Sequence, residues 1–217
     1  MALELDHVFV FVAPDAPEAA VLEESGWRES FRRDHPGQGT TNACYCFDNA
    51  YLELIWLCDR KEAETPPVAR LQLAARAEWQ SSVASPFGIG FRADLGEELP
   101  FSTWDYAAPY GFTIPIAEAS DDARQPLLFQ VSGAARPDGW TDGRPGSRQT
   151  GAGLAEIVHL RLDLPDGVCP AKPLTRLAEI GLLSIGHAPA HRLILTLSCP
   201  GNAPRRLSLP DFTFSRS

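Results

Sequence analysis

The sequence has no long hydrophobic run, and none of its apolar stretches approaches the roughly 20 residues that are needed to span a bilayer. Its first residues also lack the basic start and the apolar core of a signal peptide. These two absences argue against membrane insertion and against secretion. We therefore expect a cytoplasmic protein with no membrane partner.

Basic residues are the minority among the charged ones, with 19 Lys and Arg against 28 Asp and Glu and a net charge of -9. The basic pairs Arg32-Arg33 and Arg205-Arg206 are isolated, so the chain has no basic stripe. A nucleic-acid-binding surface depends on such a stripe to attract phosphates. We therefore expect no nucleic acid among the partners.

Paired cysteines are absent too, because the five cysteines are odd in number and do not show the spacing of a zinc knuckle or ribbon. We interpret them as reduced and mostly buried small apolar residues. Two of them, Cys44 and Cys46, share one face of a predicted strand, which leaves a metal or redox role as the alternative. The other three are Cys58, Cys169 and Cys199.

What the chain does have is the composition of an ordinary globular protein. Its 217 residues are 44% hydrophobic and 22% charged, which argues against disorder. A chain of this length can bury a core without a partner. We expect one domain over residues 1–217.

The stretch 3–12 is a predicted strand that carries a histidine among apolar residues. Side chains alternate along a strand, so two faces are predicted, both apolar, as in a strand buried on both sides. A buried imidazole must be paired, and His7 is therefore either a core histidine bonded to a carbonyl or a functional ligand. The predicted faces are Leu3, Leu5, His7, Phe9 and Phe11 on one side, and Val8, Val10 and Val12 on the other.

The order strand, helix, strand, strand, strand is predicted over residues 3–57 and returns over 156–213. Such a recurrence indicates a duplicated module. The segment between them is predicted to contain a helix at 68–79 and strands at 87–93 and 127–132. Its stretch 133–153 is rich in Gly, Pro, Asp, Arg and Ser and is predicted to be a linker or a lid over a site.

Four short motifs, LDHV at Leu5–Val8, HPGQGTTN at His35–Asn42, YLELI at Tyr51–Ile55 and IVHL at Ile157–Leu160, resemble those of a known family. They are similar to the glyoxalase-like domains of the vicinal oxygen chelate superfamily, which also includes bleomycin resistance proteins and extradiol dioxygenases. The resemblance implies an α+β fold in which paired βαβββ modules form a cupped, partly closed mixed sheet with helices outside. The modules would be residues 3–57 and 156–213, with 58–155 intervening in one domain.

The resemblance also implies a divalent metal, Zn, Fe, Ni or Mn, with His7, Glu53 and His159 as its ligands. Two imidazoles and a carboxylate suit any of these metals. The fourth ligand position falls at Ser208, where no carboxylate stands, so the catalytic base would be Asp211, Glu4 or a metal-bound hydroxide. The implied substrate pocket contains His35, Gln130 and Ser208.

Another pairing of modules is also consistent with the sequence. The strands at 87–93 and 127–132 would then open and close the second module. This pairing brings Gln130 into the closing ligand position and leaves no histidine in the opening one.

Two functions follow from the resemblance. One is a metal-dependent lyase, isomerase or dioxygenase that acts on a small oxygen-rich substrate held by the metal. The other is a non-catalytic small-molecule-binding protein, for sequestration or resistance, with a degenerate metal site. Both imply a small-molecule ligand, and the family resemblance also implies a homodimer.

Overall fold

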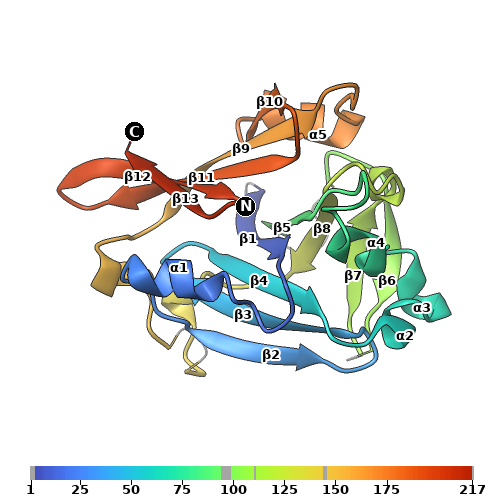
Figure 1. The fold of residues 1–217 in the computed structure, drawn as a ribbon, viewed down its shortest axis with the longest axis horizontal. Helices are drawn as coiled ribbons and strands as arrows, with labels where there is room; N and C mark the ends of the chain where they lie inside the picture. Colours follow the sequence, from blue (N-terminus) through green and yellow to red (C-terminus); the bar gives the residue numbers. More distant parts are fainter. Residues whose placement is uncertain (1–2, 94–98, 110, 144–145, 217) are drawn as a thin grey trace.

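The computed structural model describes residues 3–93, 99–109, 111–143 and 146–216, and its strands form two sheets (Figure 1). The larger sheet has the order β2-β3-β4-β1-β5-β8-β7-β6 and the smaller one β10-β9-β11-β12-β13. Their bounds are β1 Glu4–Phe11, β2 Phe31–His35, β3 Thr40–Cys46, β4 Tyr51–Leu57, β5 Phe87–Ala93, β6 Thr103–Ala107, β7 Thr113–Ala117, β8 Leu127–Ser132, β9 Ile157–Pro165, β10 Ser184–Ala188, β11 Arg192–Cys199, β12 Asn202–Leu209 and β13 Thr213–Arg216.

The helices are short. Those within residues 60–77 lie against the larger sheet and that of residues 172–179 against the smaller one, and the whole confirms the α+β class (Figure 1). None of those in the described ranges is both long and apolar enough to cross a membrane. They are α1 Ala19–Glu24, α2 Arg60–Ala63, α3 Pro66–Ala69, α4 Leu73–Ala77 and α5 Lys172–Glu179, with 3-10 turns at Glu118–Asp121, Pro137–Gly139 and Gln149–Ala152.

The larger sheet is built from two similar halves. In the first, β1 runs parallel to β4, and β2, β3 and β4 form an antiparallel meander. In the second, β5 runs parallel to β8, and β6, β7 and β8 form the meander. The two opening strands, β1 and β5, pair antiparallel and join the halves into one mixed, open sheet.

The partner of the first module in this sheet is therefore 87–132, the alternative pairing that is consistent with the sequence, and not residues 156–213 as the resemblance implies. The last segment differs in topology, because β9 pairs parallel with β10, the next strand along the chain, and not with the last one. Its leucines instead face the back of the larger sheet. Residues such as Leu162, Leu195 and Leu207 share one hydrophobic core with Val8, Val10 and Leu54.

A β-bulge in β1 changes which side chains face each side of the sheet. The register with β5 shifts between Leu5 and His7, and an extra residue in a strand reverses the alternation beyond it. Leu3 and Leu5 consequently pack with the core shared by the two sheets, on the side of Val8 and Val10, and not beside Phe9 as the regular alternation predicts. The bulge sets Asp6 and His7 next to each other at the edge of the opposite face.

That opposite face has its own hydrophobic cluster. Phe9, Phe11 and Ile55 from β1 and β4 pack with Phe129 of β8. The segment from α2 to α4 covers this cluster through Ala63, Val68, Leu71 and Leu73. Part of this face of the larger sheet is thus covered by the chain's own helices.

Candidate functional site

The predicted histidine of β1 lies in a buried polar network. Nδ1 of His7 is 2.6 Å from Oδ1 of Asp6, and Nε2 of His7 is 3.5 Å from Oε2 of Glu53. His7 is 7% exposed and Glu53 6%. Two carboxylates therefore flank one imidazole where almost no water reaches it, so polar side chains replace water at both imidazole nitrogens.

The strand register explains why these residues meet. Since β1 and β4 run parallel, Tyr51 lies opposite His7 and Glu53 lies opposite Phe9, on the same face. Oδ2 of Asp6 is in turn 3.3 Å from a guanidinium nitrogen of Arg92, which comes from the other half of the sheet. Arg92 also donates to the backbone oxygen of Asn49 at 2.8 Å.

The loop motif between β2 and β3 extends the network. Nδ2 of Asn42 donates to Oε1 of Glu53 at 2.7 Å and lies 3.4 Å from Nε2 of His35. Nδ1 of His35 is 2.9 Å from Oγ1 of Thr40. Burial lowers the pKa of His35, which favours its neutral form at neutral pH. The structure thus joins His35, an expected pocket residue, to the His7–Glu53 pair.

Aromatic rings surround His7. Tyr51 stacks on its imidazole with centroids 4.4 Å apart, and Phe129 meets it edge-on at 5.1 Å. Burial raises the pKa of Tyr51 well above its ordinary value, so its phenol stays protonated. The ring centroids of Trp140 and Tyr51 are 5.8 Å apart, so the part of the 133–153 segment that carries Trp140 lies against this side of the stack.

The opposite half of the sheet supplies glycines and a phenylalanine where a second set of ligands would stand. A Cβ on Gly88 would lie 2.0 Å from Cε1 of Phe9. A Cβ on Gly90 would lie 2.7 Å from Cε2 of Phe129 and 3.1 Å from Cε1 of His7. Ring atoms therefore occupy the volume into which side chains from β5 would extend.

These residues supply part of a metal site. Two donors that share a zinc ion at about 2.0–2.2 Å stand about 3.3–3.6 Å apart in a tetrahedron, and His7 and Glu53 have this separation. Asp6 holds the other imidazole nitrogen, as carboxylates do behind histidine ligands. However, nowhere in the described part of the chain do three His, Cys, Asp or Glu side chains come together in a group able to hold a metal.

The third expected ligand, His159, is not brought to this pair. It lies on β9 of the smaller sheet, is exposed, and has its Nε2 2.9 Å from Oγ of Ser184. It lines a hollow of about 230 Å³ that also contains Arg92 and Glu156. The expectation failed because IVHL opens a strand that packs against the back of the larger sheet.

The remaining expected site residues also lie apart from His7. Gln130 alternates along β8 with Phe129, which contacts His7, so the Gln130 side chain lies on the opposite face. Ser208 lies on β12 between two core leucines and therefore faces away from the core. Of the candidate bases, Glu4 pairs with Arg92 at 3.3 Å, and Asp211 lines a separate cleft.

Three partners of this network were not predicted. Asp6 adjoins His7 in the sequence, but regular alternation placed it on the other face. Asn42 ends the HPGQGTTN motif, and that position was the available signal for it. Arg92 had no local signal, because its role depends on the pairing of β1 with β5.

Comparison with known proteins gives one family model that matches part of the chain and several similar solved structures. Residues 5–95 match a family model described as a glyoxalase-like domain. No curated protein matches the chain significantly.

Among solved structures, methylmalonyl-CoA epimerase from Mycobacterium tuberculosis is 17% identical, with a TM-score of 0.39, over 61% of this chain and 89% of that one. A Streptomyces coelicolor methylmalonyl-CoA epimerase in complex with 2-nitronate-propionyl-CoA is also 17% identical, with a TM-score of 0.39, over 62% and 100%. A hypothetical protein from Staphylococcus aureus is 11% identical, with a TM-score of 0.47, over 99% and 84%. At these scores the likenesses say nothing about activity.

Proposed function

We propose, from the premise that this chain carries a glyoxalase-like domain of the vicinal oxygen chelate superfamily, that it is a non-catalytic small-molecule-binding protein with a degenerate metal site. The observation that carries the proposal is the asymmetry of the larger sheet. Its first half contributes His7 and Glu53, whereas the second half contributes Gly88, Gly90 and Phe129 at the same place. A metal held by two protein donors lacks the three or more that catalytic sites provide.

The internal bonds of the network support the same proposal. Both imidazole nitrogens of His7 face carboxylates, and Oε1 of Glu53 accepts from Asn42. A buried polar group that is already paired resists rearrangement, because each broken bond costs about 1–3 kcal/mol. The network therefore acts as a rigid support for the sheet, and a ligand binds where side chains make fewer hydrogen bonds to one another.

Two measurements test the proposal together. Metal analysis of protein purified without chelators or a histidine tag should give far less than one ion per chain, for wild type and for His7→Ala alike. A thermal-shift panel of aromatic drugs and metabolites should include compounds that stabilise the protein. One present at 100 times its Kd adds about 2.7 kcal/mol, or roughly 5–10 °C for a chain of this size. A panel with no stabilising compound would contradict the proposal.

The second candidate function is a metal-dependent lyase, isomerase or dioxygenase, and the geometry of Asp6, His7 and Glu53 favours it. When bound, a divalent metal would supply Lewis acidity toward an oxygen-rich substrate. In this chain Asp6 fixes the orientation of the His7 imidazole, and Asn42 fixes the Glu53 carboxylate. Stoichiometric Zn, Fe, Ni or Mn in the wild type, lost in His7→Ala, would select this function over binding alone.

The homodimer and the cytoplasmic location stay predictions from the resemblance and the sequence. Light scattering of the purified protein tests the first. Fractionation of expressing cells tests the second.

A further inference from the structure

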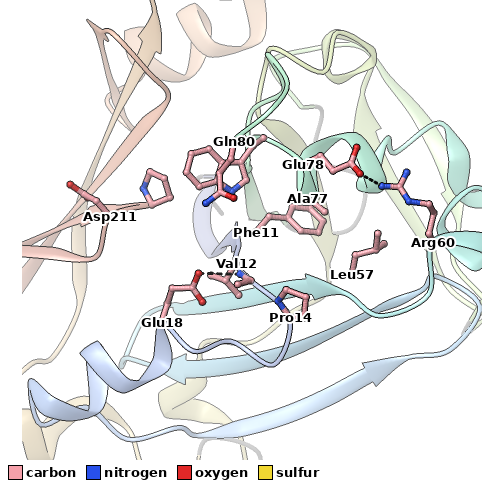
Figure 2. Close-up of a pocket in the computed structure, with 13 residues that line it drawn as sticks. Phe11, Val12, Pro14, Glu18, Leu57, Arg60, Ala77, Glu78, Gln80 and Asp211 are labelled. Atoms are coloured by element: carbon pink, nitrogen blue, oxygen red, sulfur yellow. Dashed lines mark hydrogen bonds and ion pairs between the residues drawn. The ribbon is translucent and has the colours of Figure 1, made fainter.

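A cleft of about 520 Å³ opens at the end of β1 that is farther from His7 (Figure 2). Phe11 and Leu57, near the ends of β1 and β4, form part of its wall, and Trp79 comes from the segment after α4. The turn between β12 and β13 contributes Pro210 and Asp211. Pockets for small ligands typically measure about 300–1,000 Å³, so this cleft has room for a compact organic molecule.

Four separate parts of the chain meet around this cleft, and none of the His7 network lines it. Figure 2 shows Glu18 and Pro14 on one side, Glu78 and Arg60 on another, and Asp211 on the smaller sheet. The cleft is therefore a site distinct from the metal position expected of the family.

The carboxylates of the cleft differ in whether a basic side chain neutralises their charge. Glu78 pairs with Arg60, which also donates to Glu64 at 2.9 Å. Glu18 and Asp211 make no salt bridge within the described residues. Oε1 of Glu18 accepts from the backbone nitrogen of Ala13 at 3.0 Å, while its Oε2 is buried and accepts no hydrogen bond from the part of the chain that the structure describes.

This oxygen leaves the Glu18 carboxylate beside the cleft without a positive partner within the described residues. Water does not screen a buried carboxylate oxygen, so its charge acts more strongly on its surroundings than an exposed charge does. Asp211 adds a second negative charge across the cleft, where its Oδ2 accepts from Oγ1 of Thr213 at 3.2 Å. The complementary ligand charge is positive.

The apolar wall defines the rest of the ligand. Leu57 and Trp79 are partly exposed and offer hydrophobic surface, and the face of an indole also attracts cations. A protonated amine with an aromatic or apolar body would satisfy both the carboxylates and this wall. We propose that the cleft binds such organic amines, an inference that rests on the proposed binding function and names its ligand class.

The test uses three indole compounds that share one body and differ in charge. Tryptamine is a cation, tryptophol is neutral and indole-3-propionate is an anion. Calorimetry on the full chain should show tryptamine binding most tightly and indole-3-propionate not at all. The advantage of tryptamine over tryptophol should shrink as salt is raised, because ions screen the carboxylates.

Variants locate the effect. Glu18→Gln keeps the acceptor for Ala13 and removes the charge, and Asp211→Asn does the same on the other side. Each should weaken the binding of tryptamine by about three- to fivefold, the scale of a partly exposed ion pair, without changing the binding of tryptophol. Asp166→Asn, in the turn after β9, is the matched control and should change neither.

Equal binding of tryptamine and tryptophol would overturn the inference, and so would unchanged tryptamine affinity in both cleft variants. Absence of binding by all three compounds would overturn it as well. If other compounds in the thermal-shift panel still stabilise the protein, the proposed binding function stands while the amine cleft fails. If no compound of either set binds, both fail.

Discussion

Substitution of Gly88 by alanine tests whether ring atoms occupy the second half of the concave face. An added Cβ would lie 2.0 Å from Cε1 of Phe9, 2.2 Å from its Cζ and 2.5 Å from its Cδ1. Contact at these distances is impossible, so the Phe9 ring must move. Phe9 is 5% exposed and packs against Phe11 and Phe129, which leaves it little room.

The expected cost follows from overpacking. Extra methyl groups in a well-packed core cost about 1–3 kcal/mol. For a chain of this size such a loss lowers Tm by roughly 2–12 °C, since each kcal/mol corresponds to about 2–4 °C. Urea unfolding followed by tryptophan fluorescence gives the free energy directly, and a thermal scan gives Tm.

Gly151→Ala is the matched control, because nothing lies within 4 Å of the Cβ that it adds. Its effect should stay within about 0.5 kcal/mol. A double variant then identifies the clash, since Phe9→Ala removes the ring that the new methyl group would meet. Gly88→Ala should cost almost nothing in that background, a coupling of about 1–3 kcal/mol.

Two results would refute this reasoning. A Gly88→Ala protein as stable as the wild type would show that the face has free space beside Phe9. An undiminished cost in the Phe9→Ala background would show that the clash lies elsewhere. Either result would also remove the main support for a degenerate metal site.

Three further predictions concern single side chains. Arg76 is fully buried, burial lowers its pKa to about 10, and it donates to several backbone carbonyls. Arg76→Met should therefore lower the free energy of unfolding in urea by at least about 3 kcal/mol, because each carbonyl left unpaired costs about 1–3 kcal/mol. The pKa of His35 lies below its ordinary 6.5, so below pH 6.5 the unfolded chain binds more protons than the folded one, and the stability decreases as the pH is lowered. His35→Gln should make this decrease shallower in unfolding curves measured at stepped pH. An unchanged slope would contradict the prediction. His159→Ala should change stability by less than about 0.5 kcal/mol, because the side chain is exposed, whereas His7→Ala should be clearly destabilising in the same assay.

Local sequence patterns were sufficient for the first module. The strand, helix, strand, strand, strand order of residues 3–57 is formed, and its last strand, Tyr51–Leu57, contains the YLELI motif. The motifs around His7, His35 and Glu53 also meet in one network. Both results depend on neighbouring strands and on alternation, which short-range patterns encode.

The pairing of distant segments could not be derived in the same way. The motif IVHL at His159 resembles LDHV at His7, yet one strand lies in the smaller sheet and the other in the larger one. Which strands pair across a chain is decided by packing between many residues, and a four-residue motif does not encode it. The bulge at Asp6 is a second example, because a shift of one position changed the faces of Leu3 and Leu5.

The contrast between the two ends of β1 indicates where ligand binding is energetically easier. At His7, a ligand would have to displace carboxylates from both imidazole nitrogens or the amide of Asn42 from Glu53, and each lost partner costs about 1–3 kcal/mol. At Glu18, the buried Oε2 accepts no hydrogen bond from the described residues, so an amine that binds beside the carboxylate displaces no hydrogen-bond partner from this oxygen. This difference favours binding at the cleft. Glu18→Gln, which removes the charge, should therefore affect ligand affinity more than the same change at Glu53.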